Sequence, residues 1–159
     1  MKQDTLSKWL KLIIAGLGIC GLIVYGIIIP MLAEEMVYQY PAFADCKWPW
    51  LILIWITAIP CYAVLILGWR IAANIGADHS FSISNARLLK WISIMAATDS
   101  AIFFCGNLIY LLLNMNHPGI VLLSLLISFF GVAISVASAA LSHLVMKAAE
   151  LQMQSDLTI

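Results

Sequence analysis

The sequence has very little charge, since only 10% of its 159 residues are Asp, Glu, Lys or Arg, while 64% are hydrophobic. So little polar sequence cannot cover the surface of a separate water-soluble domain. The chain has no C-x-x-C pair, which argues against a thiol oxidase or a quinone-linked reductase. Its three histidines and its scattered acidic residues lack zinc-ligand spacing. We therefore expect no catalytic residues, no metal and no cofactor.

What the chain has instead is four long apolar stretches, each close to the roughly 20 residues that a helix needs to cross a bilayer. They cover residues 12–33, 50–68, 92–113 and 119–145. The first stretch is longer than the roughly 7–15 residues of a signal-peptide core, so we interpret it as a retained span. The predicted fold is a single all-α domain over residues 1–159, an integral membrane four-helix bundle.

Charge and tryptophan placement predict the orientation. Seven of the eight lysines and arginines fall on the amino terminus, on a loop at 69–90 or on a tail at 146–159, and the eighth is Lys47. Because cationic flanks are retained in the cytoplasm, both termini should be cytoplasmic in a multi-pass protein of the bacterial plasma membrane. Tryptophans mark bilayer interfaces and agree with this orientation: Trp9, Trp69 and Trp91 on the inner side, Trp48 and Trp50 on the outer side.

Asp99 is the polar residue that most needs an explanation, because it lies about nine positions into the third span. A carboxylate near the centre of a membrane helix costs about 2.5–3.5 kcal/mol, so the side chain should face the bundle or a wet cavity. Asn107 follows two helical turns later on a similar face. We expect these two side chains to belong to one polar stripe along the third helix.

The fourth span offers small and hydroxylic residues at spacings of three and four, which let helices approach closely. Depths counted from Lys147 put Ser138 level with Asp99, and His143 about one turn nearer the cytoplasm. This predicts an intramembrane contact between Asp99 and Ser138, with His143 nearby. The small-residue face is compatible with packing inside one bundle and also with a homodimer.

The predicted cytoplasmic loop contains a start signal for the third helix. Ser82, Ser84 and Asn85 come directly before a periodic apolar run, where their side chains can cap free backbone N–H groups. Phe81 is an apolar residue in this loop. It either docks back on the bundle or marks a surface for a partner.

The tail Ala149-Glu150-Leu151-Gln152…Asp156-Leu157-Thr158-Ile159, the loop Phe81-Ser82…Asn85…Leu88 and the four-span layout resemble a family of small bacterial membrane proteins of unknown function, DUF2975. In relatives a more acidic stretch commonly precedes the terminal Asp-Leu-Thr-Ile. Here Met153, Gln154 and Ser155 occupy that interval. The resemblance implies no activity. It does imply a partner, because members are often encoded beside a very small helix-turn-helix regulator of the Xre/Cro type.

These features predict a membrane sensor or tether, not an enzyme, which binds such a regulator in the cytoplasm and makes no direct contact with nucleic acid. Residues 34–49, rich in aromatics, form the candidate input surface outside. Apolar tail residues can enter a partner's groove or lie along lipid headgroups. The predicted partner-binding residues are Phe81, Asn85, Leu151, Asp156, Leu157 and Ile159.

Two other functions remain open. Asp99 could serve a small proton- or cation-coupled transporter, since ionisable residues inside membranes often mark ion pathways. Alternatively, the aromatic outer segment could belong to an immunity or tolerance protein that acts against membrane-active peptides.

Overall fold

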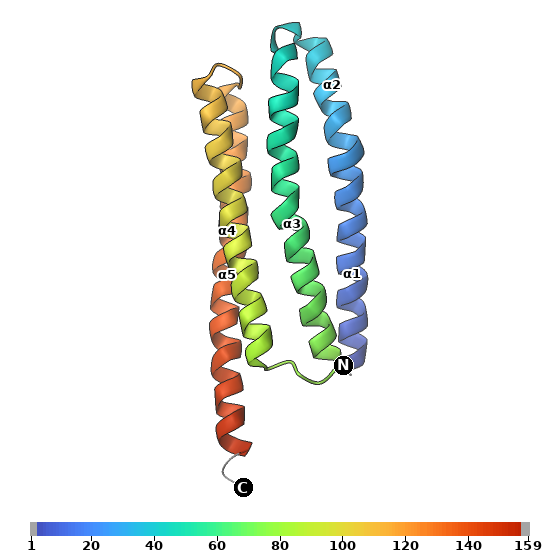
Figure 1. Ribbon diagram of the computed structural model, residues 1–159, viewed down its shortest axis with the longest axis vertical. Helices are drawn as coiled ribbons and strands as arrows, with labels where there is room; N and C mark the ends of the chain where they lie inside the picture. The colour runs from blue at the N-terminus through green and yellow to red at the C-terminus, as the bar shows by residue number, and fades with distance from the viewer. Residues whose placement is uncertain (1–2, 157–159) are drawn as a thin grey trace.

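The computed structural model describes residues 3–156, and these residues form four long apolar helices with no strand among them, which confirms the predicted all-α class (Figure 1). The first span is one long rod made of three segments. The second helix follows after a short 3-10 segment. The elements, in chain order, are α1 (Gln3–Ile23), a π-helical turn η1 (Val24–Ile28), α2 (Ile29–Gln39), the 3-10 segment η2 (Pro41–Cys46), α3 (Lys47–Gly76), α4 (Ile83–Leu112) and α5 (Pro118–Asp156).

The helices form two antiparallel hairpins that stand side by side (Figure 1). Helix α1 packs on α3, α3 on α4, and α4 on α5, whereas α1 and α5 make no close approach within the described part of the chain. The bundle is therefore an open row. The start of α1, the end of α5 and the turn at residues 77–82 lie at one end, here called the terminal end. Residues 40–46 and 113–117 lie at the other, here called the far end.

The helices at the terminal end are longer than the spans predicted from hydrophobicity. Helix α3 runs to Gly76 and α4 starts at Ile83, so the loop predicted at 69–90 is reduced to a turn of six residues. Asp78, the second residue of this turn, adopts the left-handed conformation, with φ of 64°. The Ser82 side chain accepts a hydrogen bond from the Asn85 N–H at 3.2 Å, which confirms the predicted cap. Hydropathy detects only apolar residues, whereas these helices continue beyond them.

Between α1 and α3 the contact depends on small residues. The Tyr62 hydroxyl donates to the Gly18 carbonyl at 2.9 Å. A Cβ atom added at Gly21 would lie only 2.8 Å from that hydroxyl oxygen, so the ring fits because glycine is present. At the terminal end, Ser7 donates to the Ala72 carbonyl at 2.6 Å. These bonds fix the first hairpin.

Between α4 and α5 a ladder of serines repeats every seven residues, and we call it the serine seam. Ser142 donates to the Ala86 carbonyl at 2.6 Å, and Ser135 donates to the Ser93 carbonyl at 2.8 Å. One heptad further on, Ser128 donates to the Ser100 carbonyl at 3.3 Å. A heptad repeat keeps the same faces together along two helices. The small-residue face predicted in the fourth span is thus used inside the bundle.

Candidate functional site

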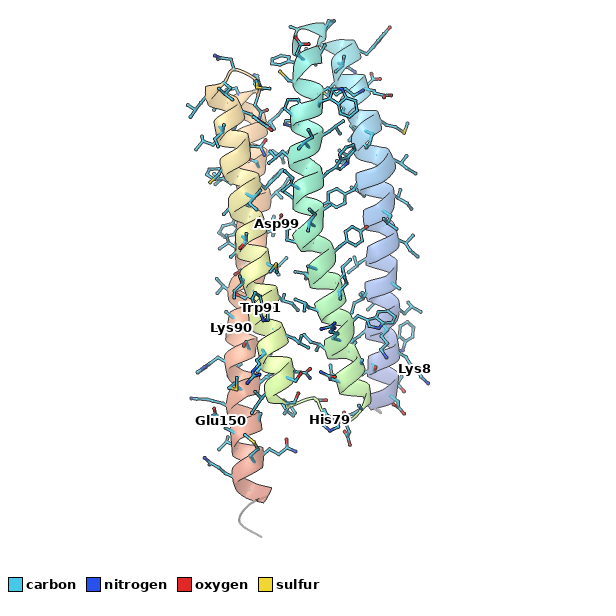
Figure 2. The ribbon with its side chains drawn as sticks, in the orientation of Figure 1. Lys8, His79, Lys90, Trp91, Asp99 and Glu150 are labelled. Atoms are coloured by element: carbon cyan, nitrogen blue, oxygen red, sulfur yellow. The ribbon has the colours of Figure 1, made fainter. Side chains whose placement is uncertain are left out.

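Asp99 lies midway along α4 on the side that faces α3 (Figure 2). Its Oδ2 atom accepts a hydrogen bond from the Cys61 thiol of α3, at a sulfur to oxygen distance of 3.7 Å. Its Oδ1 atom is buried and has no hydrogen-bond partner among the described residues. A buried carboxyl oxygen without a partner is costly. Among the described residues, Asp99 Oδ1 is the one buried side-chain oxygen or nitrogen without a hydrogen-bond partner.

A second polar contact joins the π-helical turn η1 of the first span to α3. Pro30 has no N–H to donate, and the N–H of Ile29 bonds to the Val24 carbonyl five residues earlier. The Tyr25 carbonyl therefore receives no bond from either residue. It accepts one from the Trp55 indole N–H of α3 instead, at 3.1 Å. The π-helical turn thus follows from Pro30, and such turns are frequent at functional sites.

The two contacts join into one cluster that crosses three helices. The Tyr25 hydroxyl donates to the Cys61 sulfur at 3.8 Å, and the same thiol donates to Asp99. We call Tyr25, Trp55, Cys61 and Asp99 the midspan cluster. Its members can hold a proton or bind a small polar group. Among the described residues, no group of three His, Cys, Asp or Glu side chains is placed to hold a metal ion.

The predicted contact between Asp99 and Ser138 is wrong. The serine seam places Ser135 beside Ser93 and Ser142 beside Ala86, so Ser138 lies near the level of Lys90. The count had assumed that Lys90 and Lys147 lie at one depth. Because α5 continues further beyond the bundle, Lys147 lies about nine residues, or about 13 Å, closer to the terminal end. His143 is exposed and lies further still from Asp99.

Asn107 does not share a face with Asp99, so the predicted single stripe is also wrong. Asn107 is 1% exposed and follows Ser93 and Ser100 on the heptad face toward α5. It accepts a hydrogen bond from the Asn116 amide at 2.9 Å and donates to the Phe103 carbonyl at 2.9 Å. Asn107 thereby ties the α4–α5 turn to its helix, while Asp99 faces the other hairpin.

The predicted partner-binding residues fall into three groups. Asn85 is 1% exposed, accepts from the Asn74 amide at 2.7 Å and donates to two carbonyls of the turn, so it is structural and unavailable to a partner. The Phe81 side chain is 60% exposed and Leu151 is 66% exposed. Asp156 ends α5, and its side chain lies outside the described part, as do Leu157 and Ile159.

A pocket of about 410 Å³ lies at the far end, where the two hairpins meet. Its wall is mostly apolar and combines the outer segment with the α4–α5 turn. Lys47, which also pairs with Glu34 at 3.3 Å, is its only lysine or arginine. The lining residues are Ala33, Met36, Val37, Tyr40, Phe43, Cys46, Lys47, Trp50, Met115, Asn116, His117 and Ile120.

Comparison with known proteins agrees with the fold. The family described as "Protein of unknown function (DUF2975)" matches residues 31–159. The chain belongs to this family. It is 28% identical over 160 residues to the uncharacterized membrane protein YoaS of Bacillus subtilis (strain 168), a match that covers 99% of each chain. No solved structure matches it.

The DUF2975 match includes Cys61 and Asp99, whereas Tyr25 and Pro30 precede it. Reasoning from the sequence assigned no role to Tyr25, Trp55 or Cys61. The signals that could have found them are two prolines inside apolar spans, Pro30 and Pro60. Each leaves a helix carbonyl without its usual donor, and polar side chains gather where such groups need partners.

Proposed function

We propose that this membrane protein is not an enzyme and that it tethers a small Xre/Cro-type regulator through the terminal end of α5. The observation that carries the proposal is the length of this helix. Its 39 residues span about 58 Å, whereas the hydrocarbon core of a bilayer is about 30 Å thick. Helix α5 extends past the start of α4, and Figure 1 shows it as the furthest projection of the molecule.

The projecting part of α5 has the chemistry of a docking element. Val145 and Ala149 are the last residues of α5 that are buried, and residues 150–155 are all exposed. Leu151 and Met153 are large apolar residues among them. A span that needed only a charged stop would end soon after Lys147. Exposed apolar side chains on a short helix are typical of segments that enter a partner's groove.

The charge distribution supports a cytoplasmic position for this end. Six cationic residues lie in the parts of the helices nearest this end, whereas Lys47, at the start of α3 near the far end, pairs with Glu34. Cationic flanks favour the cytoplasmic side, where a DNA-binding regulator is located. The six are Lys8, Lys11, Arg70, Arg87, Lys90 and Lys147.

The far-end pocket is the proposed input site of the sensor. It lies between the hairpins, so an apolar ligand bound there would contact both Trp50 of the first hairpin and Ile120 of the second. Such a ligand changes the relative position of the hairpins only if it binds one arrangement better than another. The immunity alternative would use this same surface to contact a membrane-active peptide.

The test is a crosslinked pull-down from native membranes, followed by mass spectrometry. We would compare the full chain with a Leu151→Asp/Met153→Asp variant. The matched control is Gln152→Asp, which adds charge to the same exposed segment without removing an apolar side chain. The full chain and the control should capture a small helix-turn-helix protein, and the double variant should lose at least about 90% of it, equivalent to a tenfold weaker complex.

Equal capture by all three chains would place the binding surface elsewhere and would contradict the role of α5. Capture of no DNA-binding protein by the full chain would reject the tether. Span insertion and expression are checked for each variant by membrane fractionation, so that loss of the protein is not mistaken for loss of binding.

A second candidate function, a proton- or cation-coupled transporter, is favoured by the unpartnered Oδ1 atom of Asp99. Ionisable groups within a membrane are conserved features of ion pathways in transporters. The carboxyl also belongs to a chain of polar groups that leads through Cys61 to Tyr25. Asp99 does not line the far-end pocket.

Transport is tested with purified protein in sealed vesicles under a pH gradient, with proton flux followed by a pH-sensitive dye. A transporter would show flux that Asp99→Asn abolishes and that Cys105→Ala, another change in α4, leaves intact. Flux equal to that of empty vesicles would remove this candidate.

A further inference from the structure

A groove of about 730 Å³ runs between α3 and α4 at the terminal end. Arg70 of α3 and Arg87 of α4 both line it, so two different helices each contribute an arginine to this groove. The two helices are held in register on either side of this level. Asn74 bonds to Asn85 toward the terminal end, and Cys61 bonds to Asp99 toward the middle. The groove therefore lies between two bonded points of the α3–α4 interface.

The groove carries positive charge that the protein does not neutralise. Neither Arg70 nor Arg87 has an ion-pair partner among the described residues. The ion pair found there joins Lys47 and Glu34 at the far end. No Asp or Glu lines the groove. Ser84, also in the lining, adds a hydroxyl close to Arg87 along α4. An anionic ligand would complete this site.

The rest of the lining is apolar and extends toward the bilayer. Leu67 of α3 and Met95 of α4 lie on the midspan side of the two arginines. Trp91 lies between Arg87 and Met95 along α4. Figure 2 shows Trp91 on α4, next to Lys90 and well below Asp99. Tryptophan at this position is typical of the boundary between headgroups and hydrocarbon. The site thus has a cationic part at headgroup level. On its midspan side it has an apolar part formed by Leu67 and Met95, here called the apolar floor.

We propose that this groove binds one anionic phospholipid, with its phosphate between Arg70 and Arg87 and an acyl chain along Leu67 and Met95. Guanidinium groups bind phosphate through paired N–H bonds, and basic pockets between membrane helices bind anionic headgroups. A free phosphate would leave the apolar floor unfilled, whereas a phospholipid matches both parts. This site does not depend on the regulator tether, since it lies between α3 and α4 and needs no residue of the projecting α5 segment.

The test uses the full chain in a non-ionic detergent, titrated with phosphatidylglycerol or phosphatidylcholine and followed by native mass spectrometry. We expect phosphatidylglycerol to bind at least about tenfold more tightly, since each surface cation contributes appreciably to anionic-lipid affinity. In Arg70→Gln/Arg87→Gln this preference should fall to about twofold or less. The matched control, Lys8→Gln/Lys147→Gln, removes two charges from the same end outside the groove and should keep the preference.

A tenfold preference that survives in the arginine variant would overturn the proposal, because the charge would act from elsewhere. Equal loss in the lysine control would show a diffuse surface effect and would overturn it as well.

Free glycerol phosphate is the final comparison. If it competes with the lipid at equal concentration, the apolar floor contributes nothing and the site is a phosphate site. Chemical modification of Arg70 and Arg87 is also compared with lipid or with an acidic peptide present. If the peptide protects these arginines and the lipid does not, the occupant is a protein and the proposal is overturned.

Discussion

The two interfaces of α4 differ in kind. Toward α5, α4 makes a heptad ladder of serine bonds, closed at the far end by Asn107 and Asn116. Toward α3, its midspan contact is one long thiol to carboxyl bond, and a groove opens at the terminal end of that interface. One interface is filled and satisfied, whereas the other keeps an unpartnered oxygen and open volume. We infer that α4 and α5 behave as one unit, and that the first hairpin can shift against this unit at the midspan level.

The largest expected effect comes from overfilling the serine seam. A Cβ atom at Gly131 of α5 would collide with the Ser100 hydroxyl of α4. Gly131→Leu should therefore lower the free energy of unfolding by about 1–3 kcal/mol, the usual cost of overpacking. The measurement is an unfolding titration with SDS in mixed micelles. Gly16→Leu is the control, because nothing lies within 4 Å of that position. A Gly131→Leu protein as stable as the control would contradict a closely packed seam.

The next effect concerns the bonded point at the terminal end of the α3–α4 interface; at the far end the Tyr110 hydroxyl donates to the Pro49 carbonyl at 2.9 Å. Asn85→Leu removes the acceptor of the Asn74 amide and the donor to the His79 and Ser80 carbonyls. Unpartnered buried groups cost about 1–3 kcal/mol, so the terminal end should loosen by that amount. Hydrogen exchange of the turn at residues 77–82 should rise accordingly. Ser84→Ala, next to it and exposed, should change stability by less than about 0.5 kcal/mol.

The smallest effect is expected at the midspan cluster. A double-mutant cycle of Cys61→Ala and Asp99→Asn measures the coupling between the two side chains. Hydrogen bonds between membrane helices average about 0.6 kcal/mol, and this one is long, so the coupling should stay below about 1 kcal/mol. A coupling above about 2 kcal/mol would make the α3–α4 interface as strongly bonded as the serine seam and would remove the difference between them.

Hydrophobic runs, caps and small-residue spacing were enough to predict the number of long helices, the Ser82 cap and a close-packed face on α5. Register was not predictable, because the depth of a span was counted from charged residues. Lys90 and Lys147 both look like membrane boundaries, yet α5 continues beyond the bundle and Lys147 is displaced from Lys90 along the helix axis.

The midspan cluster was missed for a related reason. The partner of Asp99 is a thiol, and a cysteine in an apolar span is ordinarily a small apolar residue. Trp55 was missed because its role depends on a carbonyl that Pro30 frees in another helix. Asn85 was predicted to bind a partner in the cytoplasm, which requires an exposed side chain. Its burial depends on Asn74, eleven positions earlier.

The most direct measurement compares the two interfaces of α4 at one height. Ile66, Ile94 and Ile134 are exposed residues at matching levels of α3, α4 and α5. Spin labels at 94 and 134, and separately at 66 and 94, report each interface by electron paramagnetic resonance distances in lipid. The background chain has Cys61 replaced by Ser and Cys20, Cys46 and Cys105 by Ala. We predict a narrow distribution for 94/134 and a broader one for 66/94. Two equally narrow distributions would contradict an account in which the first hairpin shifts against a rigid α4–α5 pair.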